Sequence, residues 1–166
     1  MNDFMSDEQK RKIRELIILN SSKCIDILYD TDPTPDHSQY WRGKWYVPRD
    51  GKLIKNYHVL PVSLDCSGLV EGVYRKVGLN MPDGTQNQFN ITLSTDNPRP
   101  GDLCFFGHDK DITKIYHVGM VYSDSEVIEA REPDGREWTG KVTLRGRPIW
   151  EKWKNFCGYR VHPKLI

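Results

Sequence analysis

The chain of 166 residues is about the size of one domain and is long enough to bury a core without disulfide or metal support. Hydrophobic residues make up 37% of the sequence and charged residues 28%, proportions that exclude a disordered tail and a membrane protein. The net charge of +1, with basic residues scattered among acidic ones, argues against nucleic acid as the main partner.

The start of the chain, from Met1 to Arg14, is polar and charged and has no apolar run like the core of a secretory signal. No later stretch is apolar for long enough to span a bilayer. We therefore expect a protein that is made in the cytoplasm without a signal peptide or a membrane span.

The sequence from Ser6 to Gln9 has the form of a capping box, and apolar residues then recur near helical spacing as far as Leu28. We predict a first helix here, with a break near 20–22. From Asp30 to Leu64 the pattern dissolves into prolines, glycines and aromatic residues. Such a long irregular segment is usually either functional or wrongly assigned, and its aromatic content favours a structured wall over a linker.

Residues 65–77 predict a second helix, which Asp65 can cap and Gly78 can end. Strands are predicted over 102–106, 115–122 and 126–131, the last two joined by a turn at 123–125. A strand over 142–144, a helix near 150–156 and a strand over 159–161 follow. Trp138, Trp150 and Trp153 are expected to complete the core, and a place beside a substrate groove is the alternative. Helices that precede antiparallel strands indicate an α+β fold in one domain, residues 1–166.

The four cysteines are far apart and lack the close pairs of a zinc site or a secreted disulfide framework. We therefore expect reduced thiols and no metal site. Cys24, in the helical pattern, and Cys104, in an apolar strand, are expected to be buried hydrophobic side chains. Cys66 differs because it begins the second predicted helix, where free backbone N–H groups and the helix dipole stabilise the nucleophilic thiolate. A buried structural cysteine explains that position equally well.

Among the five histidines, only His117 lies in a strand-like run, from Ile115 to Val121. Residues of odd number share one face of such a strand, so the imidazole is expected over Gly119, which leaves space beside the ring. A strand holds a catalytic ring more rigidly than a loop does. A histidine whose hydrogen bonds are satisfied in the core is the alternative.

Glu129 has the same parity as His117 in the neighbouring predicted strand, and the turn at 123–125 makes the two direct or diagonal neighbours. Their Cβ atoms are expected to lie about 5–8 Å apart. A carboxylate there could accept the ring proton of His117, fix its tautomer and stabilise the imidazolium. An exposed strand glutamate is the alternative, and on spacing alone it is the commoner case.

Three stretches of the sequence resemble, in order and spacing, the core of the NlpC-type cell-wall cysteine peptidases. They are DCSGLV at 65–70, RPGDLCFF at 99–106 and HVGMV at 117–121. Three collinear motifs are far more specific than the DCSG string alone. The resemblance covers 65–131, the expected catalytic core, between a helix and irregular aromatic segment over 1–64 and a C-terminal helix and strand over 132–166. It implies a papain-like fold in which N-terminal helices pack on a central antiparallel sheet.

Carried over by position, the resemblance implies that Cys66 is the nucleophile, His117 the base and Glu129 the residue that orients the base. Glu129 departs from the family pattern, which usually has His, Asn or Gln there, whereas the related CHAP amidases often have an acid. Asp65 and Ser67, beside the nucleophile, are expected to bind substrate.

Family members also carry a tyrosine upstream of the cysteine that helps to bind the oxyanion or the substrate. Tyr40 is the closest match and is the expected substrate-binding tyrosine, although it lies farther from Cys66 than usual, after an apparent insertion. Tyr46 and Tyr57 therefore remain candidates. The backbone N–H of Cys66 is the expected oxyanion donor.

The resemblance implies a cysteine peptidase or amidase that needs no cofactor and hydrolyses peptidoglycan stem peptides, at the bond between γ-D-glutamate and the diamino acid. Since no secretory signal is visible, we expect a phage-borne enzyme or an injected effector that reaches the wall after lysis, in a virion or by injection. A thiol acyltransferase or deamidase on the same fold, and a phage tail assembly component, are the alternatives. The sequence does not fix the oligomeric state, and a monomer is compatible with it.

Overall fold

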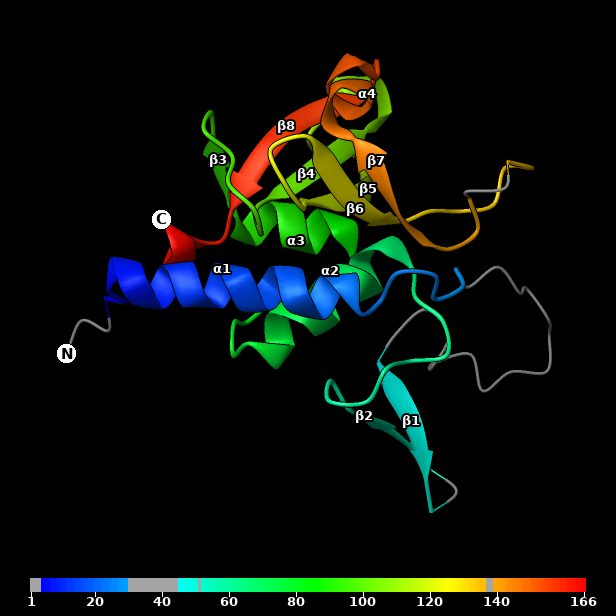
Figure 1. Cartoon of the computed structure of the whole chain (residues 1–166). Coiled ribbons are helices and arrows are strands. Elements are labelled where there is room, and N and C mark those ends of the chain that lie inside the picture. Colours follow the sequence, from blue (N-terminus) through cyan, green and yellow to red (C-terminus); the bar gives the residue numbers. More distant parts are fainter. Residues whose placement is uncertain (1–3, 30–44, 51, 137–138) are drawn as a thin grey trace.

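The computed structural model describes residues 4–29, 45–50, 52–136 and 139–166 (Figure 1). Within these residues the helices are α1 (Asp7–Ser22), α2 (Cys66–Lys76), α3 (Thr85–Ile91) and α4 (Arg147–Lys152), with short 3-10 turns at His108–Lys110 and Pro163–Leu165. The strands are β1 (Tyr46–Arg49), β2 (Lys52–Lys55), β3 (Leu93–Thr95), β4 (Leu103–Gly107), β5 (Ile115–Val121), β6 (Glu126–Ala130), β7 (Val142–Gly146) and β8 (Phe156–Val161).

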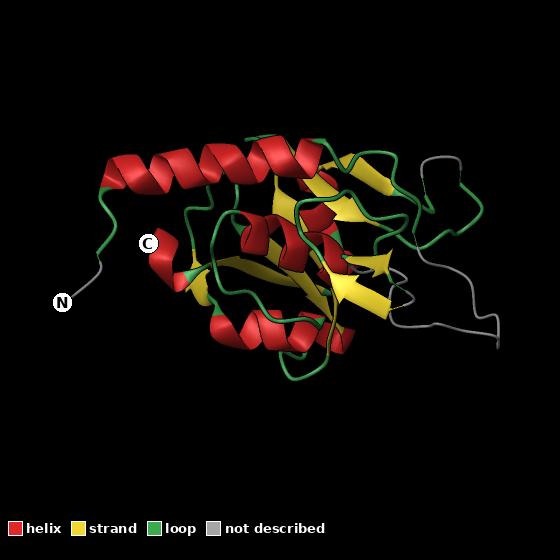
Figure 2. Ribbon diagram, turned by 90° about the horizontal axis from the view of Figure 1, so that it is seen from below, coloured by secondary structure: helices red, strands yellow, loops and turns green. Residues whose placement is uncertain are grey.

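The described strands form a central antiparallel sheet in the order β3-β8-β4-β5-β6-β7 and a separate hairpin of β1 and β2. The sheet has α1, α2 and α3 on one face and α4 on the other (Figure 1). Figure 2 shows the three N-terminal helices lying in front of the sheet. This arrangement confirms the predicted α+β class.

Two apolar clusters fill the space on either side of the sheet. The larger one lies beneath α1 and α2 and includes Leu69, Val73 and Met120. The smaller one lies beneath α4, where Trp150 packs on Phe106 of β4. No helix among the described residues combines the length and the apolar character that a membrane crossing requires.

The first helix begins as predicted, because Ser6 and Gln9 exchange the two hydrogen bonds of a capping box, at 2.7 and 3.2 Å. The predicted extension beyond residue 22 is wrong. Asp26 adopts a left-handed conformation, and its N–H donates to the carbonyl of Val142 in β7, at 3.0 Å. The apolar residues after Ser22 therefore follow the edge of the sheet and do not continue the helix.

The second helix lies where the sequence predicts it. The Asp65 carboxylate accepts a hydrogen bond from the N–H of Gly68 at 2.6 Å, which caps the helix one residue before Cys66. Gly78 follows the helix in the left-handed conformation that ends such helices. Both ends of α2 are thus determined by short-range contacts.

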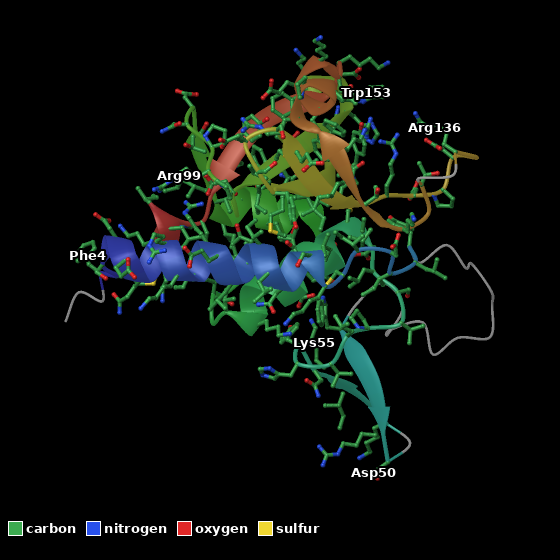
Figure 3. The ribbon with its side chains drawn as sticks, viewed as in Figure 1. Phe4, Asp50, Lys55, Arg99, Arg136 and Trp153 are labelled. Carbon is green, nitrogen blue, oxygen red and sulfur yellow. The ribbon has the colours of Figure 1, made fainter. Side chains whose placement is uncertain are left out.

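Residues 45–55 contain a β-hairpin where the sequence predicts only irregular structure. Asp50 lies at the tip of the hairpin and Lys55 at its base, next to α2 (Figure 3). The Trp45 indole N–H donates to the carbonyl of Gly68 at 2.8 Å and Lys55 pairs with Glu71, so the hairpin is fastened to α2. Each strand has four residues, too few for an alternating pattern to stand out. Residues 30–44 lie outside the described part.

The remaining differences concern short elements. The sequence predicted neither α3 nor β3, and β7 extends two residues beyond the predicted strand. α4 begins at Arg147, with Pro148 in its first turn, and β8 begins at Phe156. These elements have three to seven residues and contain few periodic positions from which to predict them.

Candidate active site

A cleft of about 290 Å³ opens at the N-terminal end of α2. Its walls come from α2, β4, β5, β7 and the loops that follow α1, β6 and α4, and they include Cys66 and His117. A larger hollow of about 880 Å³ runs along α1, but no cysteine or histidine is among the described residues that line it. The smaller cleft is therefore the candidate active site.

Cys66 is the first residue of α2 and is 8% exposed at the cleft. The helix start that presents it is held by Asp65, whose carboxylate accepts from Gly68, and by Ser67, whose hydroxyl lies 3.3 Å from Asp65 Oδ1 and from Asp83 Oδ1. Asp65 and Ser67 thus flank Cys66 but are not among the cleft-lining residues. Their expected role in substrate binding stays a prediction.

His117 links the thiol to a carboxylate. Its Nε2 lies 3.1 Å from Glu129 Oε2, which leaves Nδ1 as the nitrogen available to Cys66. Burial alone would lower the pKa of His117, but the hydrogen bonds with Cys66 and Glu129 raise it to about 10. The site therefore favours an imidazolium beside the thiol at neutral pH.

The neighbourhood of the His117 ring differs from the prediction in one respect. The space beside Gly119 is filled by Trp150, whose Cζ2 would lie 2.7 Å from a Cβ atom at position 119. The indole stacks on the imidazole with ring centroids 5.4 Å apart. Gly119 is thus required because it admits the indole, and it leaves no open space.

The predicted alternation along β5 holds for His117 and Gly119 but fails at Ile115. Ile115 joins the core cluster together with Val118, although their parities differ. The pairing of β4 with β5 shifts register at Phe106, which is the mark of a β-bulge. Bulges of this kind reorient side chains next to functional sites.

Glu129 is 0% exposed, so the alternative of an exposed strand glutamate is wrong. Its Oε1 lies 3.1 Å from Arg145 Nη1 and 3.4 Å from Arg131 Nη1. The sequence prediction missed both arginines. The two-residue period of the strand predicted over 126–131 would have placed Arg131 on the same face as Glu129, whereas Arg145 lies beyond the predicted end of its strand. The carboxylate therefore has a basic partner on each oxygen.

Tyr29, which the sequence prediction did not consider, lines this cleft together with Cys66 and interacts with it electrostatically. Burial raises the pKa of Tyr29, as do the neighbouring charges of Cys66 and Glu132. Tyr29 was missed because the first helix was predicted to continue to residue 28. In the structure the chain leaves the helix earlier and runs beside residues 63–64, just before Cys66.

Of the tyrosines that the sequence did favour, one lies away from the cleft and one lies outside the described residues. Tyr40 is outside the described residues, and Tyr46 belongs to β1. The Tyr57 hydroxyl donates to Glu71 Oε1 at 2.9 Å and takes no part in the cleft. A substrate-binding role for Tyr40 stays a prediction.

Part of the cleft lining is aromatic. It contains Tyr116 and Trp153, and the latter is 44% exposed beside α4 (Figure 3). The prediction that Trp153 completes the core is wrong, whereas Trp150 is buried as expected, and Trp138 lies outside the described residues. The four cysteines, all described, are free thiols, and no group of three possible metal ligands occurs in the described part of the chain.

Comparisons with known proteins match residues 51–152 to the model of the NlpC/P60 family. The "Probable endopeptidase p60" of Listeria monocytogenes is 32% identical over 74 residues, which are 43% of this chain and 15% of that protein. The bifunctional muramidase/DL-endopeptidase CwlT of Bacillus subtilis is 33% identical over 70 residues, which are 41% of this chain and 21% of CwlT. These two relatives are thus matched over less than a quarter of their own length.

Solved structures extend the likeness to most of the chain. The peptidoglycan hydrolase RipB of Mycobacterium tuberculosis superposes with a TM-score of 0.63 at 20% identity. The superposition covers 95% of this chain and 67% of RipB. At this identity the likeness concerns the fold.

Proposed function

The chain belongs to the NlpC/P60 family, and we propose that it is a cysteine peptidase of bacterial peptidoglycan with Cys66 as its nucleophile. The observation that carries the proposal is the contact of His117 with Cys66 on one side and with the buried Glu129 on the other. Nucleophilic catalysis by cysteine needs a base within reach and a third group that orients the base. The names of the relatives, an endopeptidase and a DL-endopeptidase, support the substrate class.

In the first half of the reaction, the Cys66 thiolate attacks the carbonyl carbon of the scissile amide. The negative charge that develops on the carbonyl oxygen is stabilised by the backbone N–H of Cys66, at the start of α2. The His117 imidazolium then gives its proton to the departing nitrogen as the C–N bond breaks. An amine leaves, and a thioester joins the acyl group to Cys66.

In the second half, water replaces the amine. The water oxygen attacks the thioester carbon, and the now neutral His117 accepts a proton from that water molecule. The C–S bond breaks, the carboxylic acid departs and the thiolate–imidazolium pair forms again. Glu129 keeps the ring in one orientation through both halves, because its hydrogen bond to Nε2 fixes the tautomer.

We propose that the bond cut joins γ-D-glutamate to the diamino acid of the stem peptide. This bond connects a D-residue to an L-centre, and the relative CwlT is called a DL-endopeptidase. The cleft supports a short peptide as substrate, because its volume of about 290 Å³ suits a few residues. Tyr116 and Trp153 supply rigid aromatic surface on one wall, while Arg131 lies on another.

The test is digestion of purified murein, followed by mass spectrometry of the released peptides. The wild type is expected to release free dipeptide or tripeptide fragments and to leave casein largely intact. Cys66→Ala should lower the rate by at least about 10⁴-fold without unfolding, because the thiolate that forms the acyl-enzyme is gone. Cys157→Ala is the matched control, since Cys157 lies in β8 outside the cleft lining.

Near-normal digestion by a folded Cys66→Ala protein would remove the proposed nucleophile. Release of glycan fragments alone would remove the peptidase assignment. Transfer of the acyl group to an added amine, with no hydrolysis, would favour an acyltransferase instead.

A further inference from the structure

We infer that Arg131 and Arg145 are positioning residues of this site, which fix the Glu129 carboxylate and offset its charge so that His117 can release its proton to the leaving group. The inference rests on the proposed roles of Cys66 and His117. It concerns groups that act through Glu129 and do not touch the reacting atoms themselves.

The contacts divide the Glu129 carboxylate between two tasks. Oε2 meets His117 Nε2 at 3.1 Å, while Oε1 meets Arg145 Nη1 at 3.1 Å and Arg131 Nη1 at 3.4 Å. The carboxylate is completely buried, and burying an ionised carboxylate is unfavourable unless it is paired and hydrogen-bonded. The two guanidinium groups satisfy that requirement on one oxygen and leave the other oxygen to the imidazole.

The sheet itself brings these groups together. Glu129 of β6 pairs with Thr143 of β7, so Arg145, two residues further along β7, lies diagonally across from Glu129 on the same face. Arg131 lies one residue past the end of β6, where its N–H donates to the carbonyl of Lys141 and its carbonyl accepts from the N–H of Gly140. Groups held by neighbouring strands keep a fixed geometry better than groups on loops.

The charge of the arginines matters for the chemistry because His117 must both hold and release a proton. A lone buried carboxylate against the ring would favour the imidazolium so strongly that transfer to the amine would be slow. Thiolate, imidazolium and carboxylate together carry one negative charge, and the two guanidinium groups change this to one positive charge. The arginines thus weaken the hold of Glu129 on the proton.

The experiment follows the protonation state of His117 as a function of pH and uses no substrate. Cys66 is alkylated with iodoacetamide across the neutral and alkaline range, and the modified Cys66 peptide is quantified by mass spectrometry. This reagent is uncharged, so the arginines do not steer it. The rate of alkylation changes at the pH at which the imidazolium loses its proton, since the thiolate then has no cationic partner. This change in rate is the transition that the variants are compared by.

In Arg145→Gln and Arg131→Gln this transition is expected to move upward by about one pH unit, because a positive charge near the ring is lost. Arg145→Lys keeps the charge and should retain the transition of the wild type. Arg147→Gln is the matched control. Arg147 lies two residues further along, and its partners are Tyr159, Glu151 and the Asp124 carbonyl. The Arg147→Gln substitution removes the same charge and should not change the pH of the transition.

A purely structural role for the arginines would lower stability but would not move the transition, and this result would overturn the inference. If Arg145→Gln does not fold, the decision passes to Arg131→Gln, whose side chain makes the longer contact and is more exposed. A wild type in which Cys66 reacts no faster than Cys157, with no transition, would instead overturn the catalytic pair on which the inference rests.

Discussion

Two buried glutamates, Glu129 on β6 and Glu71 on α2, differ in how their carboxylate groups are paired. Both Glu129 oxygens have basic partners, one histidine and two arginines. Glu71 receives Lys55 and Tyr57 on Oε1, while Oε2 has no hydrogen-bond partner among the described residues. The Glu129 carboxylate is held through both oxygens, which fixes its orientation. The Glu71 carboxylate is held through one oxygen only, and that oxygen attaches the hairpin.

The comparison predicts its largest effect at Glu129. Glu129→Ala should lower kcat for murein by about 10²- to 10⁴-fold, because the His117 ring loses its orientation and two partly buried arginines lose the carboxylate that they share. Glu129→Gln keeps an acceptor for the ring and should cost about 10- to 100-fold. Steady-state rates with stem-peptide fragments, together with circular dichroism to verify folding, give the measurement. If both variants match the wild type, another group orients the ring.

The same comparison predicts how stability depends on pH. The pKa of His117 rises from its ordinary value of 6.5 to about 10 in the folded protein. The resulting stabilisation is fully present below pH 6.5 and is lost as the pH rises through about 10. The free energy of unfolding should therefore fall across this window, on the order of a few kcal/mol.

Urea unfolding at a series of pH values measures that fall. Glu129→Gln should make it smaller, because the imidazolium loses its negatively charged partner. Glu71→Gln should leave it unchanged, since Glu71 is not among the groups that shift His117. An equal fall in all three proteins would assign the pH dependence to other groups.

The smallest effect is expected at Glu71. Glu71→Gln retains an acceptor for Lys55 and Tyr57, so the hairpin should stay attached at a cost of about 1 kcal/mol in the free energy of unfolding. Murein digestion should change by less than about twofold, because none of the described residues of the hairpin lines the cleft. A loss of activity as large as that of Glu129→Gln would show that attachment of the hairpin controls the site.

Local sequence patterns predicted the features that are determined by residues close together in the sequence. The cap of α2 and the place of Cys66 follow from residues within one helical turn. The approach of Glu129 to His117 followed from strand parity and one turn, which is still short-range information. These predictions needed no knowledge of how distant segments pack.

The parts that were missed depend on distant partners. Tyr29 reaches the cleft because residues 26–29 pair with β7 and with the segment before Cys66, and that pairing also ends the first helix. Trp150 comes to His117 from α4, and Arg145 comes to Glu129 from β7, the edge strand beside β6. Helical spacing after residue 22 was misleading because apolar residues also face a sheet edge. The route to the cell wall stays a prediction.

The indole of Trp150 stacked on His117 also gives the protein an internal optical reporter. An imidazolium quenches indole fluorescence more strongly than a neutral imidazole does, and these two rings are nearly parallel, at 24°. Trp150 is fully buried, so water does not mask the effect. The emission of the wild type minus the emission of Trp150→Phe should therefore increase as His117 loses its proton. A pH titration of these two unlabelled proteins then reports the protonation of the candidate base without any substrate.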